Sequence, residues 1–158
     1  MFPTGDSRID EILLLAEEAT GTGLLDKHRH RWRELVQELL GSIRDASDGQ
    51  VPERRRQLRA AAELEVDLLA PEEIASLATS TVGAGGVSIV MDEELPIGTP
   101  IDMSIKVAQR TVPLLLKGQV VWCKPGEVGV VFIDAFQNDR ELLEGIAVKA
   151  TLEGSKSG

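Results

Sequence analysis

Four arginines crowd into residues 53–59, a stretch that we call the arginine segment and that runs Glu-Arg-Arg-Arg-Gln-Leu-Arg. The whole chain has a formal net charge of −9, so this positive segment is a local feature. A guanidinium stays charged and can hold a phosphate, a carboxylate or the O6/N7 edge of guanine through two parallel hydrogen bonds. The segment therefore predicts a site for a compact anion such as a nucleotide. The alternative is a solvated hinge whose arginines pair with glutamates.

Other residue types that could do chemistry give weaker signals. His28 and His30 stand two residues apart in the basic run 27–33, so on a helix they point to different sides and do not predict zinc. For the run itself we favour a solvated face paired with Asp26 and Glu34 over an anion site. Cys123 ends an apolar stretch, which favours a packed side chain over a nucleophile. We expect no enzyme, no catalytic residue, no metal and no cofactor.

Composition limits the class of protein. The chain has 158 residues, of which 42% are hydrophobic and 3% aromatic, enough for one aliphatic core. The pI near 4.7 argues against binding DNA over the whole surface. One cysteine excludes an internal disulfide, and no apolar run reaches the ~18 residues of a membrane helix. We expect a cytoplasmic protein that neither carries a signal peptide nor inserts into membranes.

Residues 1–49 are expected to form a helical hairpin. Apolar residues recur at helical spacing through 9–20, glycines follow, and a longer helical pattern then ends in the turn-rich residues 45–49. The apolar stripe of the second helix must pack on the following domain or across a dimer interface, and we favour self-association because the linker lets the helices stand away. That stripe comprises Leu25, Trp32, Leu35, Val36, Leu39 and Ile43.

After the arginine segment the hydrophobic period changes from 3.6 toward 2, which predicts strands. Six are expected, at 64–68, 74–80, 87–91, 101–107, 112–122 and 128–133. Residues 83–86 are expected to turn through positive φ, and 124–127 to form a hairpin turn. Six short strands joined by tight turns predict a mainly β fold with flanking helices, built on a six-stranded antiparallel β-barrel.

A last helix is expected from Asn138, with Leu142, Leu143, Ile146 and Ala150 on its buried stripe. Together with the barrel it makes a domain of residues 50–150. Residues 151–158 are expected to be a disordered tail.

From about residue 52 to 149, the order of arginine segment, six-stranded barrel and closing helix resembles the PilZ domain family. Arg55 and Arg59 match the RxxxR linker of that family. Residues 117–122 and 128–133 resemble its late strands, and residues 138–143 resemble its closing helix. The resemblance implies a receptor or effector module that binds cyclic di-GMP, a bacterial second messenger, and passes the signal to a partner protein.

The resemblance also implies which residues hold the ligand, and here the chain departs from the family. The linker arginines Arg55, Arg56 and Arg59 would hold guanine edges and phosphates. A second motif, (D/N)xSxxG, aligns on Thr81, Gly83 and Gly86, so threonine replaces the acid or amide and glycine replaces the serine.

A shifted register with Ser80 and Gly83 keeps SxxG but puts Ala78 at the acid position. A lost charge-assisted hydrogen bond would cost on the order of 1.5–3 kcal/mol. The alternative is therefore a degenerate PilZ module that does not bind nucleotide. Such a module would act as an adaptor, through protein contacts or oligomerisation of the N-terminal helices.

Overall fold

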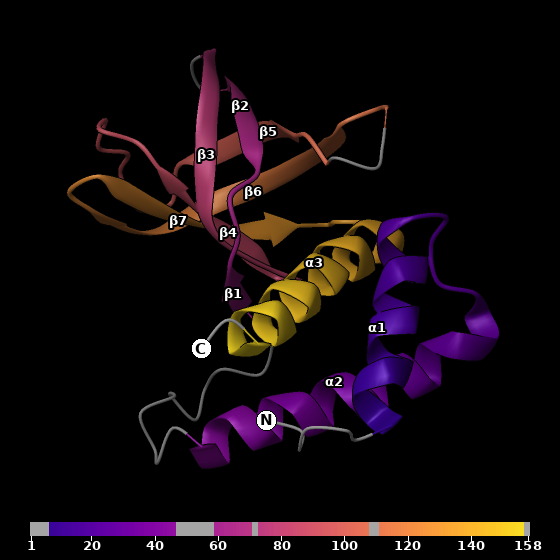
Figure 1. Ribbon diagram of the computed structural model, residues 1–158. Helices are drawn as coiled ribbons and strands as arrows, with labels where there is room; N and C mark the ends of the chain where they lie inside the picture. The colour runs from indigo at the N-terminus through magenta and orange to yellow at the C-terminus, as the bar shows by residue number, and fades with distance from the viewer. Residues whose placement is uncertain (1–6, 47–58, 71–72, 108–110, 157–158) are drawn as a thin grey trace.

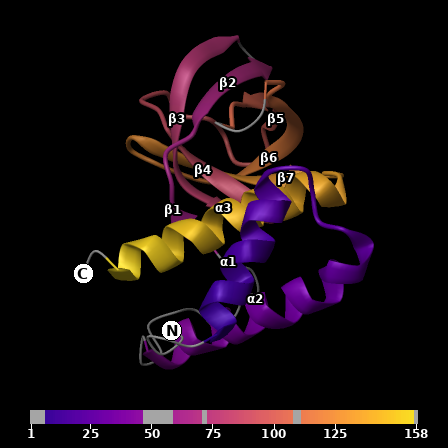
Figure 2. The same ribbon diagram turned by 45° about the vertical axis from the view of Figure 1, so that its right-hand side comes forward.

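The chain folds into three layers, with one helix in the middle. A computed structural model describes residues 7–46, 59–70, 73–107 and 111–156. The β-barrel forms one layer, helix α3 (Gln137–Lys156) lies against it, and the two N-terminal helices pack on the opposite side of α3 (Figure 1, Figure 2). This architecture confirms the mainly β fold with flanking helices.

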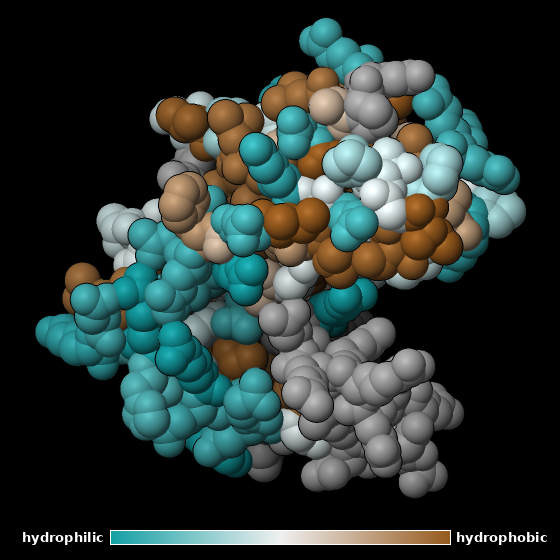
Figure 3. Space-filling model, turned by 180° about the vertical axis from the view of Figure 1, so that it is seen from behind, coloured by the Kyte–Doolittle hydropathy of each residue, from teal (hydrophilic) through white to brown (hydrophobic). Residues whose placement is uncertain are grey.

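The N-terminal helices are α1 (Ser7–Thr20) and α2 (Asp26–Ala46), as the apolar spacing predicts. A bidentate pair joins them: Arg31 donates from Nε and a terminal nitrogen to the two carboxylate oxygens of Glu11, at 2.8 and 2.7 Å. Seen from behind, the molecule is mostly hydrophilic over the helical layer, whereas apolar residues gather on the barrel (Figure 3). Large exposed apolar side chains on the outer surface of the barrel include Leu115, Val121 and Ile133.

The apolar stripe of α2 is buried within the chain. Four of its members are at most 2% exposed and pack with α1 and α3, namely Trp32, Leu35, Val36 and Leu39. Leu25 is 51% exposed, and the side chain of Ile43 lies outside the described residues. Contrary to expectation, the stripe gives no reason for self-association, because α1 and α3 cover it in the same chain.

Six strands close into the predicted antiparallel barrel. Their order around the ring is β2-β5-β6-β7-β4-β3, and β3 closes it by pairing with both β4 and β2. Their bounds are β2 (Glu65–Ala70), β3 (Ile74–Gly83), β4 (Gly86–Val90), β5 (Pro100–Ile105), β6 (Leu114–Lys124) and β7 (Glu127–Ile133). A further strand, β1 (Arg59–Ala61), pairs with β3. Three residues are too short to show a period, so the sequence did not predict β1.

The barrel interior is aliphatic. Along β6, buried and exposed side chains alternate from Leu114 to Val121, as a strand with one face inside requires. Core residues from all six strands include Val66, Leu68, Val82, Val87, Ile89, Ile101, Met103, Leu116, Val120, Val128 and Val130.

The glycines of residues 83–86 do not turn through positive φ, so that prediction is wrong. In the described residues, the glycines with positive φ are Gly23, Gly98 and Gly126, the last in the β6–β7 hairpin. Gly86 is instead required by close packing, because a Cβ there would lie 2.2 Å from the carbonyl oxygen of Val130 on β7. Its role is to let β4 approach β7.

Helix α3 serves two cores at once. Its residues Leu142 and Leu143 belong to the barrel core, whereas Ala147 and Val148 belong to the core shared with α1 and α2. A Cβ at Gly145 would lie 3.0–3.3 Å from atoms of α1, so a glycine allows the two helices to approach. The helix starts one residue before Asn138 and continues to Lys156, so residues 151–156 are helical and not part of a disordered tail.

Candidate functional site

Two adjacent residues of β3 turn their hydroxyl groups to the same partner. Ser80 Oγ and Thr81 Oγ1 each lie 2.6 Å from Ser88 Oγ on β4. In a regular strand neighbouring side chains point to opposite faces. An irregularity of the β3–β4 register between Thr79 and Thr81 breaks that alternation. The result is a cluster of three hydroxyls at the motif.

A carboxylate from another strand joins this cluster. The hydroxyl of Ser80 donates to Glu127, which begins β7, and Lys124 Nζ lies 3.1 Å from the same carboxylate. The hydrogen bond from Ser80, and then that from Lys124, lower the pKa of Glu127 below its ordinary value. Glu127 therefore stays ionised next to the motif, with 20% of its side chain exposed.

An aromatic plane completes the row across the sheet. Thr81 pairs in register with Ser88, Ser88 with Gly129, and Gly129 with Trp122. A Cβ on Gly129 would lie 2.2 Å from atoms of the Trp122 ring, so the indole lies directly over the glycine. Lys124 Nζ stands 5.5 Å from the centroid of that ring.

We call the side chains of Ser80, Thr81, Ser88, Trp122, Lys124 and Glu127 the outer-face site. Their neighbours Val87, Ile89, Val128 and Val130 point into the barrel core. Because side chains alternate along a strand, Ser88 and Glu127 lie on the face of the sheet opposite to the core, although Ser88 is only 3% exposed.

The arginine segment ends beside this site. Arg59 is exposed and pairs in register with Gly83, two residues beyond Thr81 on β3. Arg55 and Arg56 lie outside the described residues. Four of the six predicted site residues, Arg59, Thr81, Gly83 and Gly86, therefore lie on or beside the β3–β4 hairpin.

Sequence reasoning missed the contribution of β6 and β7 to the site. Glu127 and Trp122 are more than 35 positions from Thr81, and only the strand pairing brings them near. For Ser88 a signal existed, because it is the polar residue between Val87 and Ile89 in an apolar strand.

Several side chains of the basic run of α2 pair with carboxylates, whereas Arg33 makes no ion pair within the described residues. Arg29 Nε lies 3.1 Å from both carboxylate oxygens of Glu141 on α3. His28 Nδ1 lies 2.8 Å from Glu18 on α1. The run is therefore paired, as the favoured alternative expects, but the partners quoted lie on α1 and α3, and with Arg29 only 20% exposed this part of the run is packed and not solvated.

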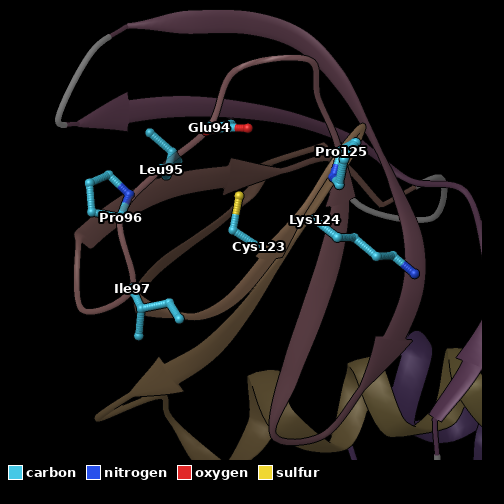
Figure 4. Close-up of a pocket in the computed structure, with 7 residues that line it drawn as sticks. All are labelled: Glu94, Leu95, Pro96, Ile97, Cys123, Lys124 and Pro125. Atoms are coloured by element: carbon cyan, nitrogen blue, oxygen red, sulfur yellow. The ribbon is translucent and has the colours of Figure 1, made fainter.

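Hollows of the described residues include two of note, the first of which shares Lys124 with the outer-face site. The first, of about 390 Å³, lies between the 94–97 loop and the β6–β7 turn (Figure 4). Cys123 points toward the loop, whereas Lys124 extends away from it (Figure 4). The second, of about 310 Å³, lies where α2, α3 and the β3–β4 turn meet.

Within the described ranges, no group of three or more His, Cys, Asp or Glu side chains is placed to hold a metal ion. Nor is any helix of these ranges long and apolar enough to cross a membrane.

Comparison with known proteins identifies the barrel. The PilZ domain family model matches residues 53–148. The PilZ domain of YcgR from Escherichia coli, solved with c-di-GMP, superimposes with a TM-score of 0.54 at 13% identity, covering 66% of this chain and 97% of that chain. No curated protein matches the chain significantly.

A second solved structure is longer than this chain. The inhibitor of motility MotI/DgrA from Bacillus subtilis superimposes with a TM-score of 0.53 at 18% identity over 65% of this chain. The match spans 53% of MotI, about half its length. At these identities both likenesses show the fold.

Proposed function

Because this chain belongs to the PilZ domain family, we propose that it is a receptor for cyclic di-GMP that passes the signal to a partner protein. The ligand would bind across the outer-face site and the arginine segment. The observation that carries the proposal is the register of Arg59 with Gly83, which attaches the end of the arginine segment beside the motif strand. A guanidinium fork from this segment suits both the phosphates and the guanine edges of the ligand.

We further propose that Glu127 supplies the acid that the motif lacks at Thr81. Guanine presents N–H donors on its Watson–Crick edge, and an ionised carboxylate accepts from them. Thr81 carries no charge, but its hydroxyl shares Ser88 with the hydroxyl that binds Glu127. The negative charge thus comes from β7 in place of β3. Trp122 and Lys124 add a plane for stacking and a cation beside it.

The arginine segment also offers a route for the signal. It lies between the end of α2 at Ala46 and the start of β1 at Arg59. A ligand bound by this segment would act on the stretch of chain that joins the helical layer to the barrel. The helical layer is therefore the surface that we expect to present the signal to a partner.

Calorimetric titration of the full chain with cyclic di-GMP tests the proposal. Wild type should bind, and Arg55→Ala and Arg59→Ala should each weaken binding by about tenfold or more, since each removes a charge-assisted contact. Arg31→Ala is the matched control, because this arginine pairs with Glu11 in the helical layer. The proposal fails if wild type releases no binding heat, or if all three variants bind like wild type.

The role of Glu127 has its own variant. Glu127→Gln keeps the size of the side chain and an acceptor oxygen but removes the charge, so binding should weaken while the melting temperature of the free protein changes little. Glu65→Gln, on the exposed side of β2, controls for the loss of one negative charge. If Glu127→Gln and wild type bind cyclic di-GMP with equal affinity, Glu127 does not contact the ligand. The proposal for the arginine segment would not be affected by this result.

The second candidate function is the adaptor that does not bind nucleotide. It is favoured by the Thr81 hydroxyl, which already engages Ser88 and stands where the family has an acid or amide. A folded wild-type protein that gives no heat with cyclic di-GMP would support the adaptor.

A further inference from the structure

The hollow of about 310 Å³ joins all three layers of the molecule. Trp32 and Arg33 come from α2, Ala84 from the β3–β4 turn, and Gln137 and Arg140 from the first turn of α3. It is separate from the outer-face site and has room for several non-hydrogen atoms, more than a single water needs.

Two guanidinium groups, those of Arg33 and Arg140, line this hollow, and Arg33 is near enough to Glu144 to oppose the rise that desolvation causes in the pKa of that carboxyl. Arg140 has a buried Nε that meets no acceptor in the part of the chain that the structure describes. Neither Arg33 nor Arg140 makes an ion pair within those ranges. A buried charged donor without an acceptor is costly, so the site is electrostatically incomplete as it stands.

The carboxylates at the hollow are already engaged. Both oxygens of Glu141 receive Arg29 Nε, and its Oε2 also lies 3.3 Å from Gln137 Nε2. Glu144 accepts from Trp32 Nε1 at 2.6 Å. The Trp32 donor is neutral, so the charge of Glu144 remains. With Arg29, Arg33 and Arg140 set against Glu141 and Glu144, the hollow keeps an excess of one positive charge, which an anion would offset.

We propose that this hollow binds a phosphate group, held by Arg140 and Arg33. Arginine forks match phosphate oxygens with two parallel N–H donors, and two forks from different helices would close around one group. Gln137 offers a further polar side chain at the wall. The hollow contains Ala84, the residue after Gly83, so a phosphate here would bridge α2 to the hairpin of the outer-face site. This second anion site does not depend on cyclic di-GMP binding at the outer face.

The test measures the NMR signal of the Arg140 Nε–Hε donor directly. Inorganic phosphate is titrated into the full chain at constant ionic strength, and the Nε–Hε cross-peaks of the arginine side chains are followed by NMR. The Arg140 cross-peak should move downfield and saturate at millimolar phosphate, whereas acetate at matched ionic strength should leave it in place. Arg140→Lys keeps the charge but removes the planar guanidinium. The phosphate affinity, measured from the saturable shifts of neighbouring backbone amides, should therefore fall about tenfold or more.

Matched variants separate binding from folding. Arg33→Gln should also weaken binding, whereas Arg31→Gln, on the same helix but paired with Glu11, should not. The indole N–H cross-peak of Trp32 reports that the helical layer stays packed in each variant. The proposal is overturned if phosphate leaves the Arg140 cross-peak unmoved, or if Arg140→Lys retains the same saturable amide shifts. It is also overturned if Glu144→Gln alone moves that cross-peak upfield, because Glu144 would then already satisfy the donor.

Discussion

Replacing Trp32 by phenylalanine should destabilise the protein in a pH-dependent way. The indole is fully buried between the helices, and its N–H donates to Glu144 at 2.6 Å. Phenylalanine keeps an aromatic ring in the core but removes the donor. A hydrogen bond to a charged group contributes about 1.5–3 kcal/mol, compared with about 0.5–1.5 kcal/mol for a neutral pair. The loss should therefore be larger when Glu144 is ionised.

The direction of the pH effect follows from the pKa of Glu144. Desolvation raises this pKa above its ordinary value of 4.5, and the Trp32 hydrogen bond opposes the rise. Between the ordinary and the raised value, the folded chain holds a proton that the unfolded chain has lost. The contribution of Glu144 to stability is therefore complete below the ordinary value and declines as the pH increases through this range. Without the indole donor the pKa rises further, and the decline becomes larger.

Urea unfolding of wild type and Trp32→Phe, followed by circular dichroism, measures this effect. We expect the variant to lose about 2–4 kcal/mol near pH 7, including some packing loss, and about 1 kcal/mol less at a pH below the ordinary carboxyl pKa. In a Glu144→Gln background the loss should be smaller and independent of pH, which makes the four proteins a double-mutant cycle. A loss that is equal at both pH values would refute the pairing of Trp32 with an ionised Glu144.

Three further changes test other parts of the structure. Gly86→Ala places a Cβ against backbone and should cost about 1–3 kcal/mol of unfolding free energy, measured in urea, so a neutral result would contradict the close strand approach. Gly145→Leu should separate α1 from α3 and speed proteolysis of the helical layer while the barrel amides keep their chemical shifts; unchanged proteolysis would count against that contact. Thr81→Asp brings a second carboxylate near Glu127, so it should strengthen cyclic di-GMP binding more in a Glu127→Gln background than in wild type. Equal increases in affinity in the two backgrounds would show that positions 81 and 127 act independently.

The barrel was predictable because its strands alternate clearly, whereas the packing of the helices was not. Residues 64–68 and 101–107 show the period of a strand on their own. The α2 stripe shows only that an apolar surface needs a cover. Helix α1 supplies part of that cover and α3 supplies the rest from more than 90 positions away, through residues such as Val148. No local pattern in α2 identifies α3 as its partner.

Some residues of the candidate site could likewise be predicted from the sequence, and others could not. Arg59, Thr81 and Gly83 are close in sequence and could be found from short motifs. Glu127 could not, because a glutamate after a hairpin turn is ordinary until the β4–β7 pairing brings it to Ser80. The positive φ expected for residues 83–86 failed for a related reason. A glycine required by the approach of a neighbouring strand and a glycine required by a turn look alike in a sequence.

The position of α3 has a consequence for synthesis. On the ribosome α1 and α2 emerge before the barrel, but the helix that completes the cover of their apolar side chains begins only at Gln137. The apolar side chains of α1 and α2 therefore stay partly exposed while the whole barrel is translated. Helices α1 and α2 therefore complete their packing only after α3 has been added. A nascent chain stalled before α3 should be a substrate for chaperones, whereas one stalled after it should not.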